Sequence, residues 1–265
     1  MNLHYETISP LLGDCLKKLF QSEVFDSFRL VGGTCLSLQL GHRRSIDIDL
    51  FTDSSYGSMD TMAIKRFLTA RFPYIENLCS LDERALGYSV RIGLSSKESI
   101  KLDLFYTERF IFPELMVDGI RLADTKEIAA MKIKAITQIE PRQKDFWDIY
   151  ELCNQYALQE MMDWAYQKDK WGFSESDVEK GFLSIFDVPE CENGIDCFRG
   201  YEWELIQIDL TEMANAYFNQ RRAFLAAVQQ GDKTRIHSLA NQGYVPTMET
   251  RNQLASFSEI IDQYF

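Results

Sequence analysis

The chain has 265 residues, of which 46% are hydrophobic and 13% aromatic, so it can bury one large core or two smaller ones. Its net charge of −12 is uneven, at −2 up to residue 150 and −10 beyond it. This acidity excludes a broad surface that coats nucleic acid, but it leaves room for a local basic cleft. No run approaches the roughly 20 apolar residues that span a bilayer, and the first residues lack a signal-peptide pattern. We therefore expect a cytoplasmic protein without a membrane segment.

The first half of the chain mixes predicted strands and helices. Ser9 followed by Pro10 predicts a helix start, because serine caps helices and proline suits the first helical position. Alternation and helical periodicity predict the other elements. These are strands over 28–31, 46–51, 86–94 and 99–106, a further strand over 116–122, and helices over 34–40 and 59–72.

Beyond residue 123 the pattern favours helix over strand. Asp124 to Glu127 resembles a capping box, and Arg221-Arg222 is interpreted as part of a solvated helix face. The sequence thus predicts an α+β protein, with a mixed sheet flanked by helices in residues 1–123 and an all-helical lobe in residues 124–265. The helices are expected over 125–138, 144–156, 159–168, 177–186, 202–230 and 251–263.

Two carboxylates interrupt a strand that otherwise suits a core. Residues two apart on a strand share a face, so Ser45, Asp47 and Asp49 are expected on one side and Ile46, Ile48 and Leu50 on the other, which faces the core. For such a pair alone, an ordinary half-exposed strand is the simpler explanation. Neighbouring residues favour a functional site.

The neighbouring residues suit phosphate and metal binding. Gly32 and Gly33, between a strand and a helix, let backbone N–H groups approach a phosphate. Asp103 alternates with leucines on another strand, and three carboxylates converge if the two strands are neighbours. Arg43 and Arg44 could hold triphosphate oxygens, or could equally offset the repulsion between the carboxylates.

Clustered carboxylates repel each other and raise one another's pKa unless a divalent cation lies between them. Hard oxygen ligands select Mg²⁺ or Mn²⁺. Two such ions can activate an attacking hydroxyl and stabilise a leaving pyrophosphate. The residues therefore indicate a metal site at Asp47, Asp49 and Asp103.

The strand, Gly-Gly-Thr, helix and Ser-Ile-Asp-Ile-Asp together resemble the first motif of the DNA polymerase β-type nucleotidyltransferase superfamily. More narrowly, GGTCLSLQLGHRRSIDIDLF with EIAAMKIKAI and KDFWDIYEL resembles the AbiEii/AbiGii toxin family, over about residues 28–152. The resemblance implies a nucleotidyltransferase-type α/β domain and a helical lobe, with an NTP as substrate and Mg²⁺ or Mn²⁺ as cofactor. It further implies a toxin-like protein of a type IV toxin–antitoxin or phage-defence system, with tRNA as one acceptor and an antitoxin protein as partner.

The resemblance also assigns residues. Asp47 and Asp49 match the metal-binding pair, Asp103 the superfamily's third carboxylate, and Lys132 the helix lysine. The remaining matches are the downstream acidic pair, Asp145 and Asp148, and the nucleotide-binding positions Gly32, Gly33, Thr34, Arg44 and Ser45, with Thr34 standing where other members have serine. Lys132, Asp145 and Asp148 are expected to line a cleft between the domains.

Helical periodicity supports part of this assignment independently. On the helix over 125–138, Lys132 lies within the apolar stripe, so it has a partner or extends to the edge of the stripe. Asp145 could simply cap its own helix, and Asp148 could lie on a solvated flank.

We expect transfer of a nucleoside monophosphate from an NTP to an acceptor. In this mechanism Gly33 and Thr34 grip the terminal phosphates, Asp47 and Asp49 hold the metal ions, and Asp103 deprotonates the acceptor or completes the metal shell. Two other functions stay open. One is a catalytically silent module that binds nucleotides or proteins, and the other is a transferase for small molecules of the antibiotic type.

Overall fold

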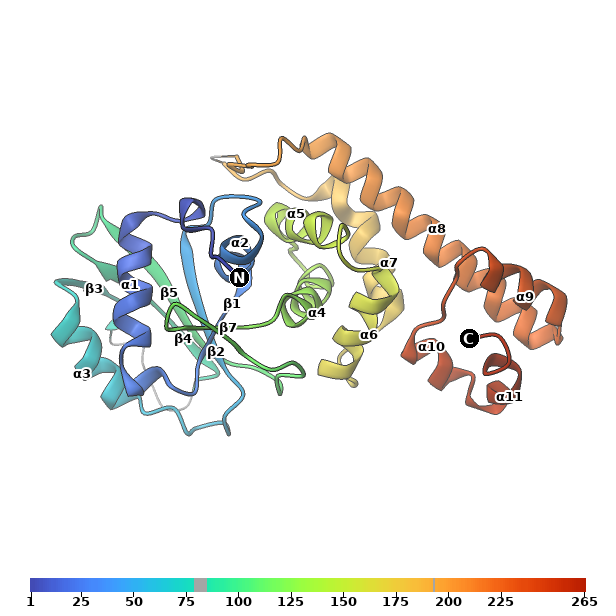
Figure 1. The fold of residues 1–265 in the computed structure, drawn as a ribbon, viewed down its shortest axis with the longest axis horizontal. Helices are drawn as coiled ribbons and strands as arrows, with labels where there is room; N and C mark the ends of the chain where they lie inside the picture. The colour runs from blue at the N-terminus through green and yellow to red at the C-terminus, as the bar shows by residue number, and fades with distance from the viewer. Residues whose placement is uncertain (79–84, 193) are drawn as a thin grey trace. The chain divides into compact units, whose positions relative to one another are not determined.

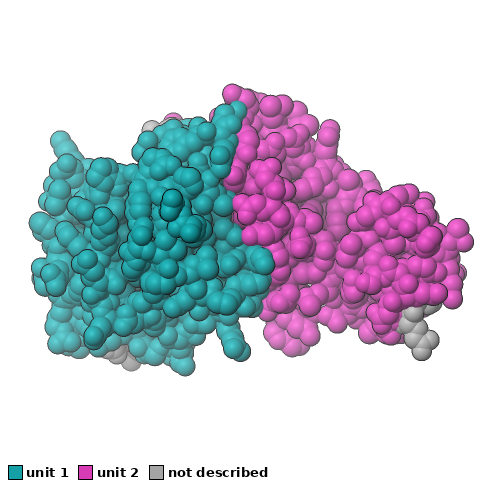
Figure 2. Space-filling model, viewed as in Figure 1, with its two compact units in different colours: residues 1–128, 193–200 teal, residues 129–192, 201–265 magenta. Residues whose placement is uncertain are grey.

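The protein is described by a computed structural model that covers residues 1–78, 85–192 and 194–265. The chain forms two compact units, which are shown in separate colours in Figure 2. The first unit contains residues 1–128 with 193–200, and the second contains residues 129–192 with 201–265. The predicted division after residue 123 stays a prediction.

The first unit is built on a mixed sheet, which over the described residues has seven strands in the order β3-β4-β5-β2-β1-β7-β6. β2 is parallel to β5 and antiparallel to β1, while β4 is antiparallel to β5 (Figure 1). The predicted α+β class, with strands first and helices after, is confirmed. The strands are β1 (Arg29–Val31), β2 (Asp47–Thr52), β3 (Tyr74–Glu76), β4 (Gly87–Gly93), β5 (Ser99–Tyr106), β6 (Leu115–Val117) and β7 (Ile120–Leu122).

Strict alternation in β2 and β5 divides the sheet into a buried face and a partly exposed face. In both strands buried residues, among them Ile48, Leu50, Leu102 and Leu104, alternate with half-buried ones, which include the acidic residues and the rings of Phe51 and Phe105. α1 packs on β2, β4 and β5, and contributes the fully buried side chains Leu12, Leu16 and Leu19. The charged residues Asp47, Asp49, Lys101 and Asp103 therefore lie on the opposite face.

Capping residues mark the start of one helix and the end of another in the first unit. Ser9 caps α1, because its hydroxyl accepts a hydrogen bond from the Leu12 amide at 3.1 Å. Gly41 ends α2 in the left-handed conformation, with φ of +67°. The helices are α1 (Pro10–Phe20), α2 (Gly32–Leu40) and α3 (Thr61–Arg71), with short 3₁₀ turns at Tyr5–Thr7 and Glu23–Phe25.

Three features of the first unit differ from the sequence prediction. The single strand expected over 116–122 is a hairpin of β6 and β7, because Asp118 and Gly119 both adopt positive φ and reverse the chain. β3 was not predicted, since its three residues are half-buried or exposed and show no alternation of buried and exposed positions. Glu127, expected in a capping box, is buried and accepts hydrogen bonds from the amides of Ile111 and Phe112.

A distant segment completes the first unit. The loop-like stretch near residue 195 returns to the start of β2, where Arg43 and Cys197 form an antiparallel bridge. The Phe198 amide donates to the carbonyl of His42 at 2.8 Å, and the Arg44 amide donates to that of Asp196 at 2.8 Å. Five cysteines among the described residues are free, and Cys79 lies outside those residues. Across the described ranges, no helix is both long and apolar enough to cross a bilayer.

The regular secondary structure described in the second unit is helical. Stacking of Trp147 on Trp203, with ring centroids 6.1 Å apart, joins α5 to α8. α8 is the longest helix, and its C-terminal half packs against α9, which was not predicted. The helices are α4 (Thr125–Ala135), which begins in the first unit, α5 (Gln143–Leu152), α6 (Leu158–Lys168), α7 (Glu175–Leu183), α8 (Trp203–Gln230), α9 (Lys233–Asn241), α10 (Met248–Gln253) and α11 (Ser258–Ile261).

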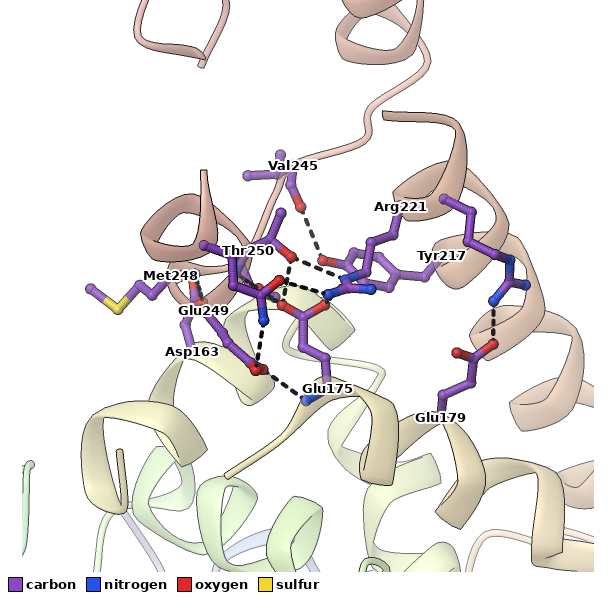
Figure 3. Close-up of polar contacts among 12 residues, drawn as sticks. Asp163, Glu175, Glu179, Tyr217, Arg221, Val245, Met248, Glu249 and Thr250 are labelled. Atoms are coloured by element: carbon purple, nitrogen blue, oxygen red, sulfur yellow. Dashed lines mark hydrogen bonds and ion pairs between the residues drawn. The ribbon is translucent and has the colours of Figure 1, made fainter. Parts of the chain in front are cut away.

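A buried carboxylate fastens α10 to α7 and α8 in the second unit (Figure 3). Glu175 is fully buried and forms an ion pair with Arg221, with 2.5 Å between Oε2 and Nε. Thr247 and Thr250 both donate their hydroxyl hydrogens to Glu175 Oε1. The prediction that Arg221 lies on a solvated face is therefore wrong, whereas Arg222 is half exposed as expected and pairs with Glu179.

Asp163 beside this network makes the stability of the second unit depend on pH. Burial raises the pKa of Asp163 from 3.8 to about 6, although its carboxylate accepts the Met248 amide at 2.6 Å. The folded protein thus keeps this proton up to about pH 6, while the unfolded chain loses it near pH 3.8. The stability from this proton is present at low pH and is lost as pH rises through about 6.

We predict that Asp163→Asn reduces the fall in melting temperature between pH 4 and pH 7, because an amide keeps the acceptor oxygen and cannot ionise. Thermal unfolding followed by tryptophan fluorescence measures this. Asp177→Asn, at an exposed position on α7, is the control and should retain the wild-type slope. Identical pH profiles for wild type and Asp163→Asn would contradict the assignment.

Candidate active site

Three carboxylates lie on the partly exposed face of the first unit's sheet. Asp47 and Asp49 are both half-buried on β2, whereas Ile48 between them is fully buried. β5 pairs with β2 so that Asp103 lies directly beside Asp49. Since directly paired residues project to the same side of a sheet, the three carboxylates share one face. The expectation that the two acidic strands are neighbours is confirmed.

Gly32 lets the backbone at the start of α2 lie against the carboxylate of Asp49. β1 pairs with β2 at Val31 and Asp49, and the next residue turns away with φ of +66°. A Cβ atom at position 32 would overlap Asp49 Oδ2. Gly32 is therefore required both for its conformation and for the space that Asp49 occupies.

The hydroxyls of Thr34 and Ser45 fix the start of β2. Thr34 is fully buried in α2, and its Oγ1 lies 2.8 Å from Ser45 Oγ. The same hydroxyl donates to the backbone carbonyl of Asp47. The hydroxyls of Thr34 and Ser45 thus position the strand that carries Asp47 and Asp49.

The two arginines have different surroundings. Arg43 is 4% exposed, and its Nη2 would lie 2.5 Å from a Cβ atom at Gly33. Arg44, the predicted phosphate ligand, is exposed and forms an ion pair of 2.7 Å with Asp196. Arg43, rather than Arg44, is therefore the arginine that packs against Gly33. Periodicity in the sequence could not have distinguished the two arginines.

Asp103 is held by its neighbours on the sheet. Lys101 donates to Asp103 Oδ2 at 2.6 Å, and Ser89 of β4 donates to Oδ1 at 2.5 Å. Lys101 was not among the predicted site residues, although its spacing of two from Asp103 places it on the same face. Within the part of the chain that the structure describes, no three acidic, histidine or cysteine side chains form a group that could hold a metal ion.

The donor set nevertheless fits a divalent cation of the Mg²⁺ type. Such ions are commonly bound by one or two protein carboxylates, with water and substrate phosphates completing the shell. Asp47 and Asp49 supply two carboxylate ligands on one face, and the absence of a side chain at Gly32 leaves room for the carboxylate of Asp49. These two aspartates are the residues that would hold the ion.

A second group of predicted residues comes together within the second unit. Lys132 of α4 is 5% exposed, and its Nζ lies 2.6 Å from Asp145 Oδ1 and 2.7 Å from Asp148 Oδ2. Both aspartates belong to α5 and are buried. Lys132 therefore has buried partners and does not extend to the edge of the stripe, and Asp148 is not on a solvated flank.

Arg142, which was not predicted, is the fourth member of this cluster. Its Nε donates to Asp145 Oδ2 at 2.9 Å, from three residues earlier in the chain. Burial raises the pKa of Asp145, but the charge of Lys132 and the hydrogen bond from Arg142 outweigh it and lower the pKa below its usual value. Asp145 is therefore a carboxylate held in its charged form. That this cluster faces the carboxylates of the first unit stays a prediction.

We predict that Lys132→Met destabilises the protein by about 3–5 kcal/mol, because it removes the ammonium group that two buried carboxylates, Asp145 and Asp148, share. Lys134→Met on the same helix is the matched control, since Lys134 is 36% exposed and pairs with the partly exposed Asp169. The control should lower the free energy of unfolding by about 0–1 kcal/mol. Urea unfolding of both variants measures the difference, and equal losses would contradict the role given to Lys132.

The chain shares its sequence pattern with one described family. A family model for the nucleotidyl transferase AbiEii toxin of type IV toxin–antitoxin systems matches residues 14–170, which is more than half of the chain. An uncharacterized protein of Aquifex aeolicus (strain VF5), aq_aa25, is 32% identical over 147 residues. That match covers 54% of this chain and 66% of the relative, which is just under two thirds of the relative's length.

Two solved structures are similar at low identity. The crystal structure of JHP933 from Helicobacter pylori is 17% identical with a TM-score of 0.43, over 86% of this chain and 99% of that one. An antigenic nucleotidyltransferase-like protein from Paracoccidioides brasiliensis is also 17% identical, with a TM-score of 0.39, over 68% of this chain and 95% of that one. At these scores the likeness supports no conclusion about function.

Proposed function

Because the chain belongs to the nucleotidyl transferase AbiEii toxin family, we propose that it transfers a nucleoside monophosphate from an NTP to an acceptor in a reaction that depends on Mg²⁺ or Mn²⁺. The observation that carries this proposal is the contact between Gly32 and Asp49, next to Asp103. At this contact a glycine turn at a helix start lies beside paired carboxylates. The glycine turn suits a phosphate, and the carboxylates suit a cation.

The roles in the first unit follow from position. The backbone at Gly33 and Thr34, at the start of α2, would bind the terminal phosphates of the NTP, with Arg43 beside Gly33 to balance their charge. Asp47 and Asp49 would hold the metal, which when bound polarises the phosphate and stabilises the leaving pyrophosphate. Ser45 and Thr34 keep the strand in place while these groups act.

Asp103 would accept the proton of the attacking hydroxyl. Lys101 and Ser89 fix its two oxygens, so the carboxylate is oriented before the acceptor arrives. Transfer then forms a bond between the acceptor oxygen and the α-phosphorus and breaks the bond to pyrophosphate. In the second unit, Asp145 and Asp148 would fix the position of the Lys132 ammonium group.

The family also suggests the biological setting. Its type IV toxin–antitoxin description supports an antitoxin protein as partner, and tRNA is the acceptor that we would test first. We further propose that the protein works in the cytoplasm, where NTPs and tRNA are found.

We predict that Asp47→Asn and Asp49→Asn lower transfer by at least ~100-fold, because the amide weakens a metal ligand without changing its size. Purified protein, labelled NTPs, Mg²⁺ and total tRNA would give the rate. Asp53→Asn is the matched control, since Asp53 follows the same strand and its carboxylate accepts the amide of Phe110.

Transfer to tRNA, protein or a small molecule that is lost in the two β2 variants would support the proposal. Binding of NTP without transfer to any acceptor would contradict it, and would favour a catalytically silent module instead. Equal activity in Asp47→Asn and Asp53→Asn would also contradict the roles assigned to β2.

A further inference from the structure

The exposed face of the central sheet carries three kinds of chemistry in consecutive rows. Register across β2, β5 and β4 aligns residues in threes, and every one of the nine is half-buried, while the residues between them on the three strands are buried. The nine-residue face has a mostly basic row (Asp47, Lys101, Arg91), a carboxylate row (Asp49, Asp103, Ser89) and an aromatic row (Phe51, Phe105, Gly87).

The aromatic row forms a partly exposed platform. The rings of Phe51 and Phe105 are paired, with centroids 5.8 Å apart and an angle of 52° between their planes. A Cβ atom at Gly87 would overlap the ring of Phe105, so this ring lies over the glycine backbone of β4. The absence of a side chain at position 87 thus lets an aromatic ring cover the sheet.

The row spacing matches the dimensions of a nucleotide. Successive rows are two residues apart along each strand, which is roughly 6.6 Å. If the base of a nucleotide lies on the aromatic row, its sugar hydroxyl reaches Asp103 in the next row. The phosphate of the same nucleotide then lies near Lys101 and Arg91, one row further along. The order aromatic, acidic and basic is therefore the order of base, reacting hydroxyl and phosphate.

We propose that Phe51 and Phe105 bind the unpaired terminal base of a nucleic-acid acceptor and so position its hydroxyl at Asp103. This rests on the proposed transferase function and narrows its acceptor to the unpaired 3′ end of a nucleic acid, for which RNA serves as the probe. Stacking on aromatic side chains suits any base, because every base has a π-face. Phe51 and Phe105 are positioning residues, and they take no part in the chemistry.

A binding experiment without NTP tests the platform directly. The probe is a short single-stranded RNA with 2-aminopurine as its 3′-terminal base, whose fluorescence falls when the base stacks. We expect quenching by the wild-type protein, and about tenfold weaker binding with Phe105→Leu or Phe51→Leu. Phe105→Tyr should restore binding, because it keeps an aromatic ring.

Phe67→Leu is the matched control. Phe67 is a half-buried aromatic residue of α3, and its ring packs edge-on against Phe25 with 5.3 Å between centroids. The control makes the same chemical change away from the nine-residue face, so it should leave quenching unchanged. Equal weakening by Phe67→Leu and Phe105→Leu would mean that the aromatic row is only structural, and would overturn the inference.

Transfer kinetics separate this inference from the proposed function. With RNA as acceptor, we expect Phe105→Leu to raise KM for RNA about tenfold and to leave KM for NTP unchanged. Transfer to a protein or small molecule that Phe105→Leu and Phe51→Leu leave unaffected would overturn the inference while the proposed function stands. Ring-dependent RNA binding without any transfer would uphold the platform and contradict the proposed function.

Discussion

The close approach of the Gly32 backbone to the carboxylate of Asp49 is the constraint on which the candidate site depends. Position 32 has a positive φ, and the space that a side chain would need is occupied by Asp49. The contact links the end of β1, the start of α2 and the middle of β2 at one point. Because β5 is paired with β2 in register, the position of Asp49 also sets the place of Asp103, and with it the three rows of the nine-residue face.

Local patterns in the sequence predict most of the first unit. Alternation identified β2, β4 and β5, and Ser9 marked a helix start that the structure confirms. Periodicity also placed Lys132 in a buried stripe. These successes share one cause, since each depends on residues within one or two turns or on the two faces of a single strand. Roles in catalysis do not follow from such patterns and stay predictions.

What the sequence could not supply is pairing between distant segments. The partner of Arg44 is Asp196, which lies 152 residues away, and Arg221 is only 17% exposed because it pairs with the buried Glu175. Helical periodicity shows which side of a helix is apolar. It does not show which distant carboxylate forms an ion pair with an arginine or lysine at the border of that side. The hairpin at Asp118 was a different kind of failure, because an Asp-Gly turn signal was present and was read as part of a strand.

Mn²⁺ binding to the intact protein tests the central claim most directly, because it reports on the carboxylates without requiring an acceptor. Gly32→Ala and Gly57→Ala form a matched pair for this titration, followed by electron paramagnetic resonance. Both glycines have positive φ, but only at position 32 would the new Cβ atom overlap a carboxylate, since nothing lies within 4 Å of it at position 57. We predict that Gly32→Ala loses Mn²⁺ binding as Asp49→Asn does, while Gly57→Ala binds like the wild type. Equal Mn²⁺ affinity in all four proteins would contradict the account.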